Sequence, residues 1–388
     1  MKQPVYLDYS ATTPVDPRVL EDMLPWFCER FGNPANISHS YGREALKAVQ
    51  KARQELAKLL NAKPHEIVFT SGATESNNLA FKGLYTLLPE KNQVLTVATE
   101  HKAVLCSAKA LEAQGFEVDI LPVNRQGFVD PSLLAEKISS RTALVSVMMV
   151  NNEIGNLQPI AEIGALCRAH DVLFHCDAVQ GGGKLPIDVQ ALQIDMLSLS
   201  AHKMYGPKGI GCLYLRHREP LIPLKACIEG GGQEGGLRAG TLNIPGIVGF
   251  GKAAELALAE LEVERLRLQT LRKQLYQGIL KALPEVYLST PLESSSPAIL
   301  HLCFPGLSKG RLIVSLTDLA VSAGSACSSA SGKASYVLEA LGLESDLSNN
   351  ALRFSLGRFT TAAEIDAAIN SVIQAVAKLK ARPSKLPF

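Results

Sequence analysis

Short segments rich in β-branched residues alternate with longer helical segments over the first two thirds of the chain, and this alternation limits the folds it can adopt. Three helices are predicted between the strands, over 43–60, 104–114 and 160–170. Strand–helix alternation predicts an α/β fold with a mostly parallel sheet covered on both faces. The predicted strands are residues 66–70, 94–98, 117–121, 143–150, 172–176, 196–200 and 211–215.

Length and one long helix predict a second, smaller unit. A chain of 388 residues exceeds what one ordinary hydrophobic core supports. Residues 251–283 form one nearly uninterrupted helical stretch, about 45 Å long for roughly 30 residues, which is enough to connect two domains. Strand-like 298–304, a helix from Lys309 and strand-like 351–355 then suggest an α+β unit. We expect a large domain over 13–258 and a small domain from 1–12 and 259–388.

Composition excludes several classes of function. The 39 basic and 37 acidic residues leave a net charge of +2, so no direct nucleic-acid binding is expected. No run of about 18 apolar residues exists, and the N-terminus enters a strand-like stretch directly, so we expect neither a membrane span nor a signal peptide. The eight cysteines stand singly, without CxxC spacing, which indicates reduced thiols and a cytoplasmic location.

Lys203 is the first candidate catalytic residue. A buried-looking strand runs into Ser200, His202 and Lys203, and a glycine-rich turn follows. A partly desolvated lysine has a lowered pKa and can form a Schiff base. Ser200 and His202 could add contacts to a phosphate. The alternative is a loop lysine that extends into water, but the position at the end of a strand favours the catalytic interpretation.

Residues 69–77 are a candidate phosphate site. A strand ends and a helix begins around Gly72, among hydroxyl side chains. Free backbone N–H groups and the helix dipole would hold a phosphate there. An ordinary helix N-cap is the alternative interpretation.

Asp177 follows another apolar strand, in the sequence His175-Cys176-Asp177. Sheets of this class bind ligands at the carboxyl ends of their strands. A carboxylate there would keep the nitrogen of a pyridine-ring cofactor protonated. Metal binding is the alternative, but adjacent strand residues point to opposite faces and cannot all reach one ion, so no metal is expected.

Cys327 lies in a segment, 320–332, in which eleven of thirteen residues are Gly, Ala or Ser. This composition predicts a mobile loop, and we expect Cys327 to be the one cysteine of the eight outside apolar surroundings. Such a thiol becomes reactive when a base or cation lowers its pKa. The alternative is a bystander cysteine.

Two further polar residues follow or lie on predicted strands. His101 follows strand 94–98 and could stack on a flat cofactor or move protons, or be a structural residue. Arg353 alternates with Leu352 and Phe354, so it could bind a carboxylate or be a surface strand residue. The glycine-rich residues 230–241 predict a shaped loop near a ligand or a subunit interface.

Taken together, these segments resemble the group I cysteine desulfurases (the NifS- and IscS-like type), in the class V aminotransferase family of fold-type I pyridoxal-phosphate enzymes. The resemblance covers nearly the whole chain. Its motifs are YLDYSATTPVDPRV (6–19), FGNP (31–34), IVFTSGATESNNLA (67–80), TEHKAVL (99–105), VNNEIG (150–155), SAHKMYGPKGIG (200–211), RAGTLN (238–243), SAGSACSSAS (322–331) and RFSLGRFTT (353–361).

The resemblance implies a large domain with a seven-stranded sheet and a role for each matching residue. Lys203 would carry pyridoxal 5'-phosphate, His101 would stack on its ring, and Asp177 would contact the ring nitrogen. Cys327 would accept sulfur. The other residues implied are Ala73, Thr74, Asn152, Gln180, Ser200, His202 and, from the second subunit of a homodimer, Thr241 for the cofactor, and Asn33, Asn152 and Arg353 for the substrate.

The implied reaction converts L-cysteine to L-alanine and leaves a persulfide on Cys327. The sulfur would pass to an acceptor protein such as an iron–sulfur scaffold, or toward other sulfur-containing cofactors and tRNA. Cluster-assembly members carry a scaffold-docking extension beyond the point where this sequence ends, Phe388, so we expect a different acceptor or docking place.

Two alternatives remain open at this point. A class V aminotransferase or C–S lyase would not need Cys327. A non-catalytic partner of a cluster-assembly complex would not take up the cofactor, and the presence of Lys203, Asp177 and Cys327 together disfavours it.

Overall fold

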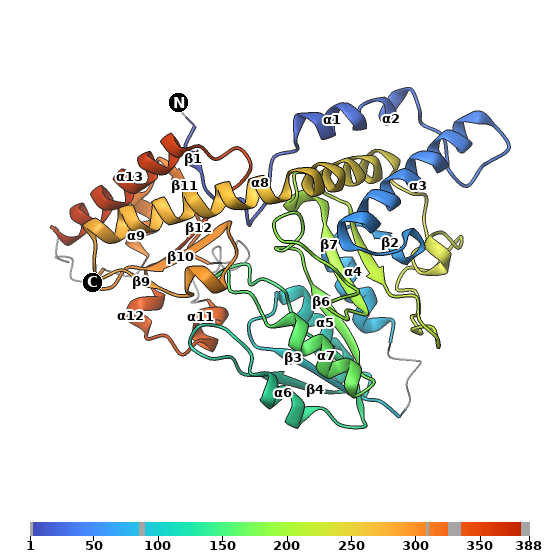
Figure 1. Cartoon of the computed structure of the whole chain (residues 1–388), viewed down its shortest axis with the longest axis horizontal. Coiled ribbons are helices and arrows are strands. Elements are labelled where there is room, and N and C mark those ends of the chain that lie inside the picture. Colours follow the sequence, from blue (N-terminus) through green and yellow to red (C-terminus); the bar gives the residue numbers. More distant parts are fainter. Residues whose placement is uncertain (1–2, 85–89, 308–309, 325–334, 382–388) are drawn as a thin grey trace.

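The computed structural model describes residues 3–84, 90–307, 310–324 and 335–381, and its largest sheet has seven strands, which lie together in one part of the molecule (Figure 1). The strands run in the order β2-β8-β7-β6-β5-β3-β4. Their bounds are β2 (Ile67–Thr70), β3 (Gln93–Val97), β4 (Glu117–Leu121), β5 (Thr142–Ser146), β6 (Leu173–Asp177), β7 (Met196–Ser200) and β8 (Gly211–Leu215). β8 is antiparallel to both of its neighbours and the other pairs are parallel, which confirms the predicted mostly parallel sheet.

Helices cover both faces of this sheet because successive strand residues point in opposite directions. Met196 of β7 packs on the side of α4 (Ala73–Lys82) and α5 (Lys102–Glu112). Its neighbour Leu197 faces the other side, which is covered by the helices α3 (Ser40–Leu60), α7 (Ile160–Ala169) and α8 (Ile244–Ala282). A short helix, α6 (Pro131–Lys137), precedes β5. The sheet therefore has a buried core on each face.

Helix α8 connects this sheet to a second hydrophobic core. Its 39 residues correspond to about 58 Å of helix, and Figure 1 shows it running along both parts of the molecule. Phe250 and Ala254 in its first half belong to the sheet core, whereas Leu271 and Leu275 in its second half belong to the second core. The helices α1 (Pro17–Met23) and α2 (Pro25–Cys28) lie along its first half.

The second core forms around two small sheets. β9 (Tyr287–Leu288), β10 (Ile299–Cys303) and β12 (Ala351–Ser355) are antiparallel, whereas β1 (Val5–Tyr6) pairs with β11 (Leu319–Ala320) in parallel. Leu7 packs in this core, so the N-terminal segment joins a core whose other buried residues lie between positions 268 and 376. The helices of this part are α9 (Arg311–Ser315), α11 (Tyr336–Ala340), α12 (Ser345–Ser348) and α13 (Ala362–Lys380).

No helix among the described residues is both long and apolar enough to span a membrane.

The described residues also form four 3₁₀ turns. The turn η2 (Ala201–Lys203) directly follows β7 and carries the candidate lysine. The others are η1 (Pro64–Glu66), η3 (Glu234–Gly236) and η4 (Leu292–Ser294).

Candidate active site

A cavity of about 610 Å³ opens where the strands of the large sheet end, a size that suits a small-molecule cofactor. β6 ends at Asp177 and β7 ends at Ser200, so the chain delivers polar side chains to one edge. Ten of the residues predicted from the sequence line this cavity. They are Ala73, Thr74, His101, Asn152, Asp177, Gln180, Ser200, His202, Lys203 and Arg353.

The Lys203 amine lies inside the cavity and not in bulk water. Its Nζ donates hydrogen bonds to the backbone carbonyls of Ser10 and Ala11, the latter at 2.7 Å. Burial, followed by the charges of the nearby cations Lys184 and Arg353, lowers the pKa of Lys203 to about 7. A neutral amine is therefore accessible near neutral pH, as a Schiff-base lysine requires.

Asp177 is fixed by two hydrogen bonds and is 5% exposed. Asn77 Nδ2 donates to Asp177 Oδ2 at 2.9 Å, and the backbone N–H of Val179 donates to Asp177 Oδ1 at 3.1 Å. Asn77 projects from α4, which packs beside the strand that ends at Asp177. The carboxylate is thus held in one orientation at the edge of the cavity, where it can meet a cationic ring nitrogen.

The N-terminus of α4 forms an anion-binding surface at the cavity. Gly72 precedes the helix with φ of 156°, a conformation that favours glycine, and a Cβ added there would lie 3.9 Å from Ser200 Oγ. The helix therefore presents its first N–H groups beside the Ser200 hydroxyl. His202 lies nearby, and burial, followed by the charges of Lys203 and Lys208, lowers its pKa to about 4.

His101 is the N-cap residue of α5. Its Nδ1 accepts a hydrogen bond from the backbone N–H of Ala103 at 3.1 Å. Burial lowers the pKa of His101, so the ring is neutral and carries its proton on Nε2. A neutral imidazole on the cavity wall can lie flat against an aromatic cofactor.

Arg353 is 1% exposed, which makes the surface-residue interpretation wrong. It lies on β12, opposite the core side chains Leu352 and Phe354. Its Nη2 donates to Asp8 Oδ1 at 2.5 Å and its Nη1 to the backbone carbonyl of Asn152 at 2.7 Å. Among the described residues, Arg353 Nε and Asn152 Oδ1 are buried without a partner, so both remain available to a carboxylate or an amine in the cavity.

Two of the described residues that the sequence predicts do not line the cavity, and a third predicted residue is not described. Cys327 lies outside the described residues. Thr241 and Asn33 are exposed on this chain, Asn33 in the connection between α2 and α3. The expectation that Cys327 is the one cysteine outside apolar surroundings is wrong, because three of the seven described cysteines are exposed: Cys28, Cys106 and Cys227.

His175 belongs to the core and not to the cavity. Its Nδ1 pairs with Ser146 Oγ at 2.8 Å and its Nε2 with Ser198 Oγ at 3.0 Å, so neighbouring hydroxyls occupy both ring nitrogens. Burial lowers the pKa of His175 to about 4. Cys176 is also buried, and its side chain points to the opposite core.

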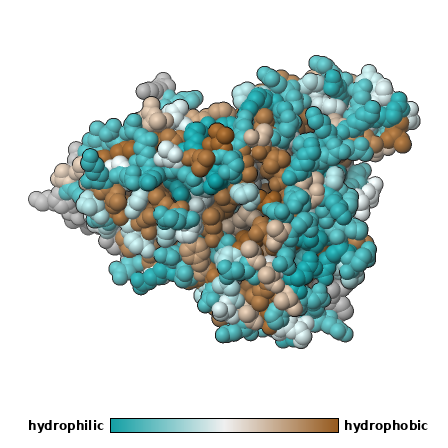
Figure 2. Space-filling view, in the orientation of Figure 1, coloured by the Kyte–Doolittle hydropathy of each residue, from teal (hydrophilic) through white to brown (hydrophobic). Residues whose placement is uncertain are grey.

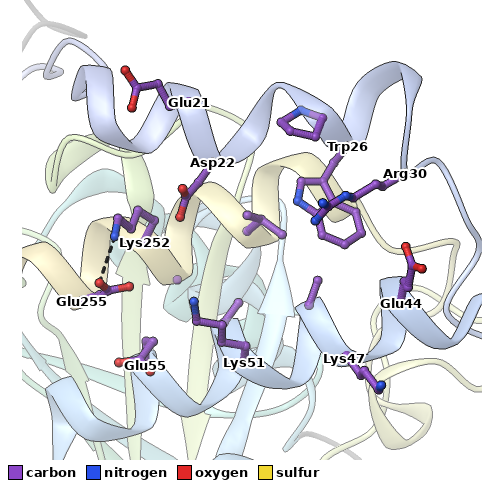
Figure 3. A pocket seen from close by; sticks show the side chains of 15 residues that line it. Glu21, Asp22, Trp26, Arg30, Glu44, Lys47, Lys51, Glu55, Lys252 and Glu255 are labelled. Carbon is purple, nitrogen blue, oxygen red and sulfur yellow. Dashed lines mark hydrogen bonds and ion pairs between the residues drawn. The ribbon is translucent and has the colours of Figure 1, made fainter. Parts of the chain in front are cut away.

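A second cavity, of about 580 Å³, lies between α1, α2, α3 and α8 (Figure 3). Its wall mixes acidic and basic side chains, such as the Lys252–Glu255 ion pair at 2.9 Å. Arg30 lies over the Trp26 ring at 5.7 Å. None of the residues predicted for catalysis lines this cavity, so the strand-end cavity is the candidate active site.

Known proteins of similar sequence decide the family. Residues 5–368 match the family Aminotransferase class-V. A cysteine desulfurase IscS of Anaeromyxobacter sp. (strain Fw109-5) is 52% identical over 381 residues, which are 98% of this chain and 94% of that protein. The chain belongs to the cysteine desulfurases of the class-V aminotransferase family. A cysteine desulfurase IscS of Salmonella schwarzengrund (strain CVM19633) is 51% identical over 383 residues, with the same coverage.

Solved structures agree with this assignment. A NifS-like protein matches 97% of this desulfurase and 100% of its own chain, with a TM-score of 0.90 and 37% identity. SspA in complex with cysteine matches 92% of this chain and 99% of its own, with a TM-score of 0.79 and 39% identity. The fold-type I assignment is confirmed.

Enzymes of this family depend on pyridoxal 5'-phosphate, and so does this desulfurase. The strand-end cavity fits that cofactor on its own geometry. The space in front of Gly72 is open, which suits a phosphate at the α4 N-terminus. Gln180 Oε1 joins Asn152 Oδ1 as a buried polar atom without a partner among the described residues, as expected where a polar ligand binds.

Proposed function

We propose that this cysteine desulfurase holds its cofactor and its substrate L-cysteine in the strand-end cavity and that Lys203 is the residue that moves protons there. The proposal rests on one observation, which is that four groups line a single cavity. They are the Lys203 amine, the Asp177 carboxylate, the N-terminus of α4 and the buried Arg353.

The residues divide between the two ends of the cofactor. The N–H groups of Ala73 and Thr74 hold the phosphate, together with Ser200 and His202. Asp177 holds the ring nitrogen in its protonated form, which makes the bound pyridoxal 5'-phosphate a sink for electrons released at the substrate Cα. His101 lies against the ring. The side-chain amides of Gln180 and Asn152 form hydrogen bonds with the other polar atoms of the cofactor and substrate.

Arg353 and Asn152 orient the substrate. The guanidinium binds the carboxylate of L-cysteine with charge-assisted hydrogen bonds, and Asp8 keeps the guanidinium in place. The Lys203 amine, a large fraction of which is neutral near pH 7, accepts the Cα proton.

Cys327 accepts the sulfur. Its thiolate attacks the substrate sulfur, an S–S bond forms, and the bond between Cβ and sulfur breaks with its electron pair remaining on carbon. Protonation of that carbon, together with return of a proton from Lys203 to Cα, completes L-alanine, and the persulfide on Cys327 passes to an acceptor protein such as an iron–sulfur scaffold.

A second copy of the chain completes the site in this proposal. Thr241 and Asn33 are exposed here and do not line their own chain's cavity, which supports a role in the cavity of a partner subunit. The connection that carries Asn33 also exposes Phe31 and Ile37, and Figure 2 shows hydrophobic surface at that end of the molecule. We place the homodimer in the cytoplasm.

Replacement of Cys327 by serine tests the reaction. C327S should bind pyridoxal 5'-phosphate like the parent and lose alanine formation from L-cysteine by a factor of about 100 or more, because a hydroxyl is a poor nucleophile toward sulfur. Mass spectrometry of the parent after cysteine treatment should show one added sulfur on the Cys327 peptide. C28S, which changes an exposed cysteine of α2, is the control. Undiminished alanine formation by C327S would rule out the persulfide step.

A further inference from the structure

A second buried lysine lies directly behind Lys203. Lys184 follows three consecutive glycines after β6 and is 4% exposed. Its Nζ donates a hydrogen bond to the backbone carbonyl of Lys203 at 3.0 Å. The turn that carries it packs closely, since a Cβ at Gly183 would lie 3.1 Å from Ala257 of α8. Lys184 therefore contacts the catalytic segment without lining the cavity.

The hydrogen bond to the Lys203 carbonyl does not by itself explain why a charged residue is buried at position 184. Burying an ammonium group is unfavourable, whereas a neutral amide could donate to the same carbonyl at a lower cost. Burial lowers the pKa of Lys184 to about 8, which leaves it mostly charged near pH 7, and the acid that faces it is Glu264 of α8. Its carboxylate is shared, because Arg358 Nε donates to Glu264 Oε2 at 3.0 Å and the Tyr205 hydroxyl to Oε1 at 3.2 Å. Lys184 is thus only partly neutralised.

Two cations and two acids act on the pKa of Lys203. Lys184 faces it from the turn after β6, and Arg353 faces it from β12. The acids are Asp8, which is bound to Arg353, and Asp177 at the end of β6. Of the two cations, Lys184 has the larger effect on the pKa of Lys203 after burial itself.

We propose that Lys184 is a positioning residue for the desulfurase reaction, whose hydrogen bond fixes the Lys203 backbone and whose charge opposes a positive charge on the Lys203 nitrogen. The inference rests on the proposed role of Lys203. Lys184 touches neither substrate nor cofactor and acts through Lys203 alone. Tyr205, with φ of 63°, ends the same short segment and links it to Glu264, so the segment is held at both ends.

The test separates the charge of Lys184 from its hydrogen bond. K184Q keeps a donor and removes the charge, K184M removes both, and K184R keeps the charge. The visible absorption of the bound cofactor, titrated against pH in the holoenzyme, reports protonation of the Lys203 nitrogen. K252Q, which removes a lysine near the surface of α8, is the control.

Without the neighbouring charge, the Lys203 nitrogen should keep its proton to higher pH. We expect the titration of K184Q and K184M, and the acidic limb of their kcat/KM profiles, to move up by about one pH unit. K184R and K252Q should titrate like the parent, and either folded charge-removing variant is sufficient for the test. A parent-like titration of K184Q or K184M would overturn the proposal.

A separate measurement shows whether the proposed role of Lys203 itself is wrong. K203A should lose the visible absorption that depends on the lysine, whatever residue occupies position 184. If K203A keeps that absorption, Lys203 does not carry the cofactor. If K203A loses it while the K184Q and K184M titrations are unchanged, Lys203 carries the cofactor and Lys184 is a structural residue.

Discussion

Burial sets the charge of the basic residues around the active site. His101 and Lys203 both have lowered pKa values, with burial as the largest cause, and so does His202. Neutral nitrogen bases are what a site needs when it must take a proton from carbon near neutral pH. The acid that stays oriented among them, Asp177, is held by an amide and a backbone N–H. Burial of these three basic side chains therefore favours their uncharged forms in the cavity.

The same burial predicts how stability depends on pH. His175 titrates at about 6.5 when unfolded and at about 4 when folded, so the unfolded state binds more protons between these values. Stability is therefore lost as pH falls from about 6.5 toward 4, by about 2 kcal/mol at pH 5 from this residue. Urea unfolding at pH 7 and pH 5 should show a smaller difference in H175Q than in the parent. An equal difference would mean that His175 is already protonated in the fold.

Sequence patterns located the site residues that directly follow strands. They missed the residues that contact these site residues from distant parts of the sequence. Lys203, Asp177 and His101 stand at the ends of recognisable strands. Asp8 and Asn77 lie within motifs of the family resemblance but received no role from sequence. Their contacts, with Arg353 and Asp177, join residues 345 and 100 positions apart, and local periodicity carries no signal for such pairs.

At the scale of elements, glycines in α8 determine how closely two helices approach. A Cβ at Gly251 would lie 2.5 Å from Ala52 Cα in α3, which is backbone and cannot move alone. We expect G251A to lose about 1–2 kcal/mol despite the better helix propensity of alanine. In G278A, the nearest atom is the flexible end of Ile369, so this matched variant should lose less. Thermal unfolding that ranks G278A below G251A would contradict the packing argument.

These glycines also explain where the sequence misplaced an element. The predicted helix begins at Gly251, but α8 begins at Ile244. Asn243 Oδ1 accepts from the backbone N–H of Gly246 at 3.1 Å, and Pro245 suits the first turn. Glycines usually indicate a break, yet here they allow a neighbouring helix to pack. Strands β4, β7, β8 and β12 match their predicted bounds, because β-branched and apolar runs define them locally.

At the scale of the whole molecule, the active site depends on both cores at once. Lys203 follows a strand of the large sheet, whereas Arg353 lies on the small sheet of the second core. Arg358, five residues further, lies over the Tyr205 ring at 4.4 Å and donates to Asp16 Oδ2 at 2.8 Å. These contacts, together with α8, fix the two cores relative to each other, so the substrate arginine and the catalytic lysine keep one geometry.

The homodimer proposal makes a prediction about which subunit supplies Thr241. T241V removes one hydroxyl donor to the cofactor phosphate, which should weaken cofactor binding by about 10-fold or more. Because Thr241 is exposed and outside its own chain's cavity, the loss should appear in the partner's site. Heterodimers of one K203A chain and one T241V chain, purified through two different tags, test this directly.

In such a heterodimer, the T241V chain keeps Lys203 and receives an intact Thr241 from the K203A chain. Its site should therefore bind pyridoxal 5'-phosphate with the parent affinity, and the heterodimer should show about half of the parent activity. The site of the K203A chain should stay inactive. If Thr241 instead served its own chain, the one site that retains Lys203 would bind the cofactor as weakly as the T241V homodimer. Equal affinities in the heterodimer and the T241V homodimer would therefore exclude a site shared between subunits.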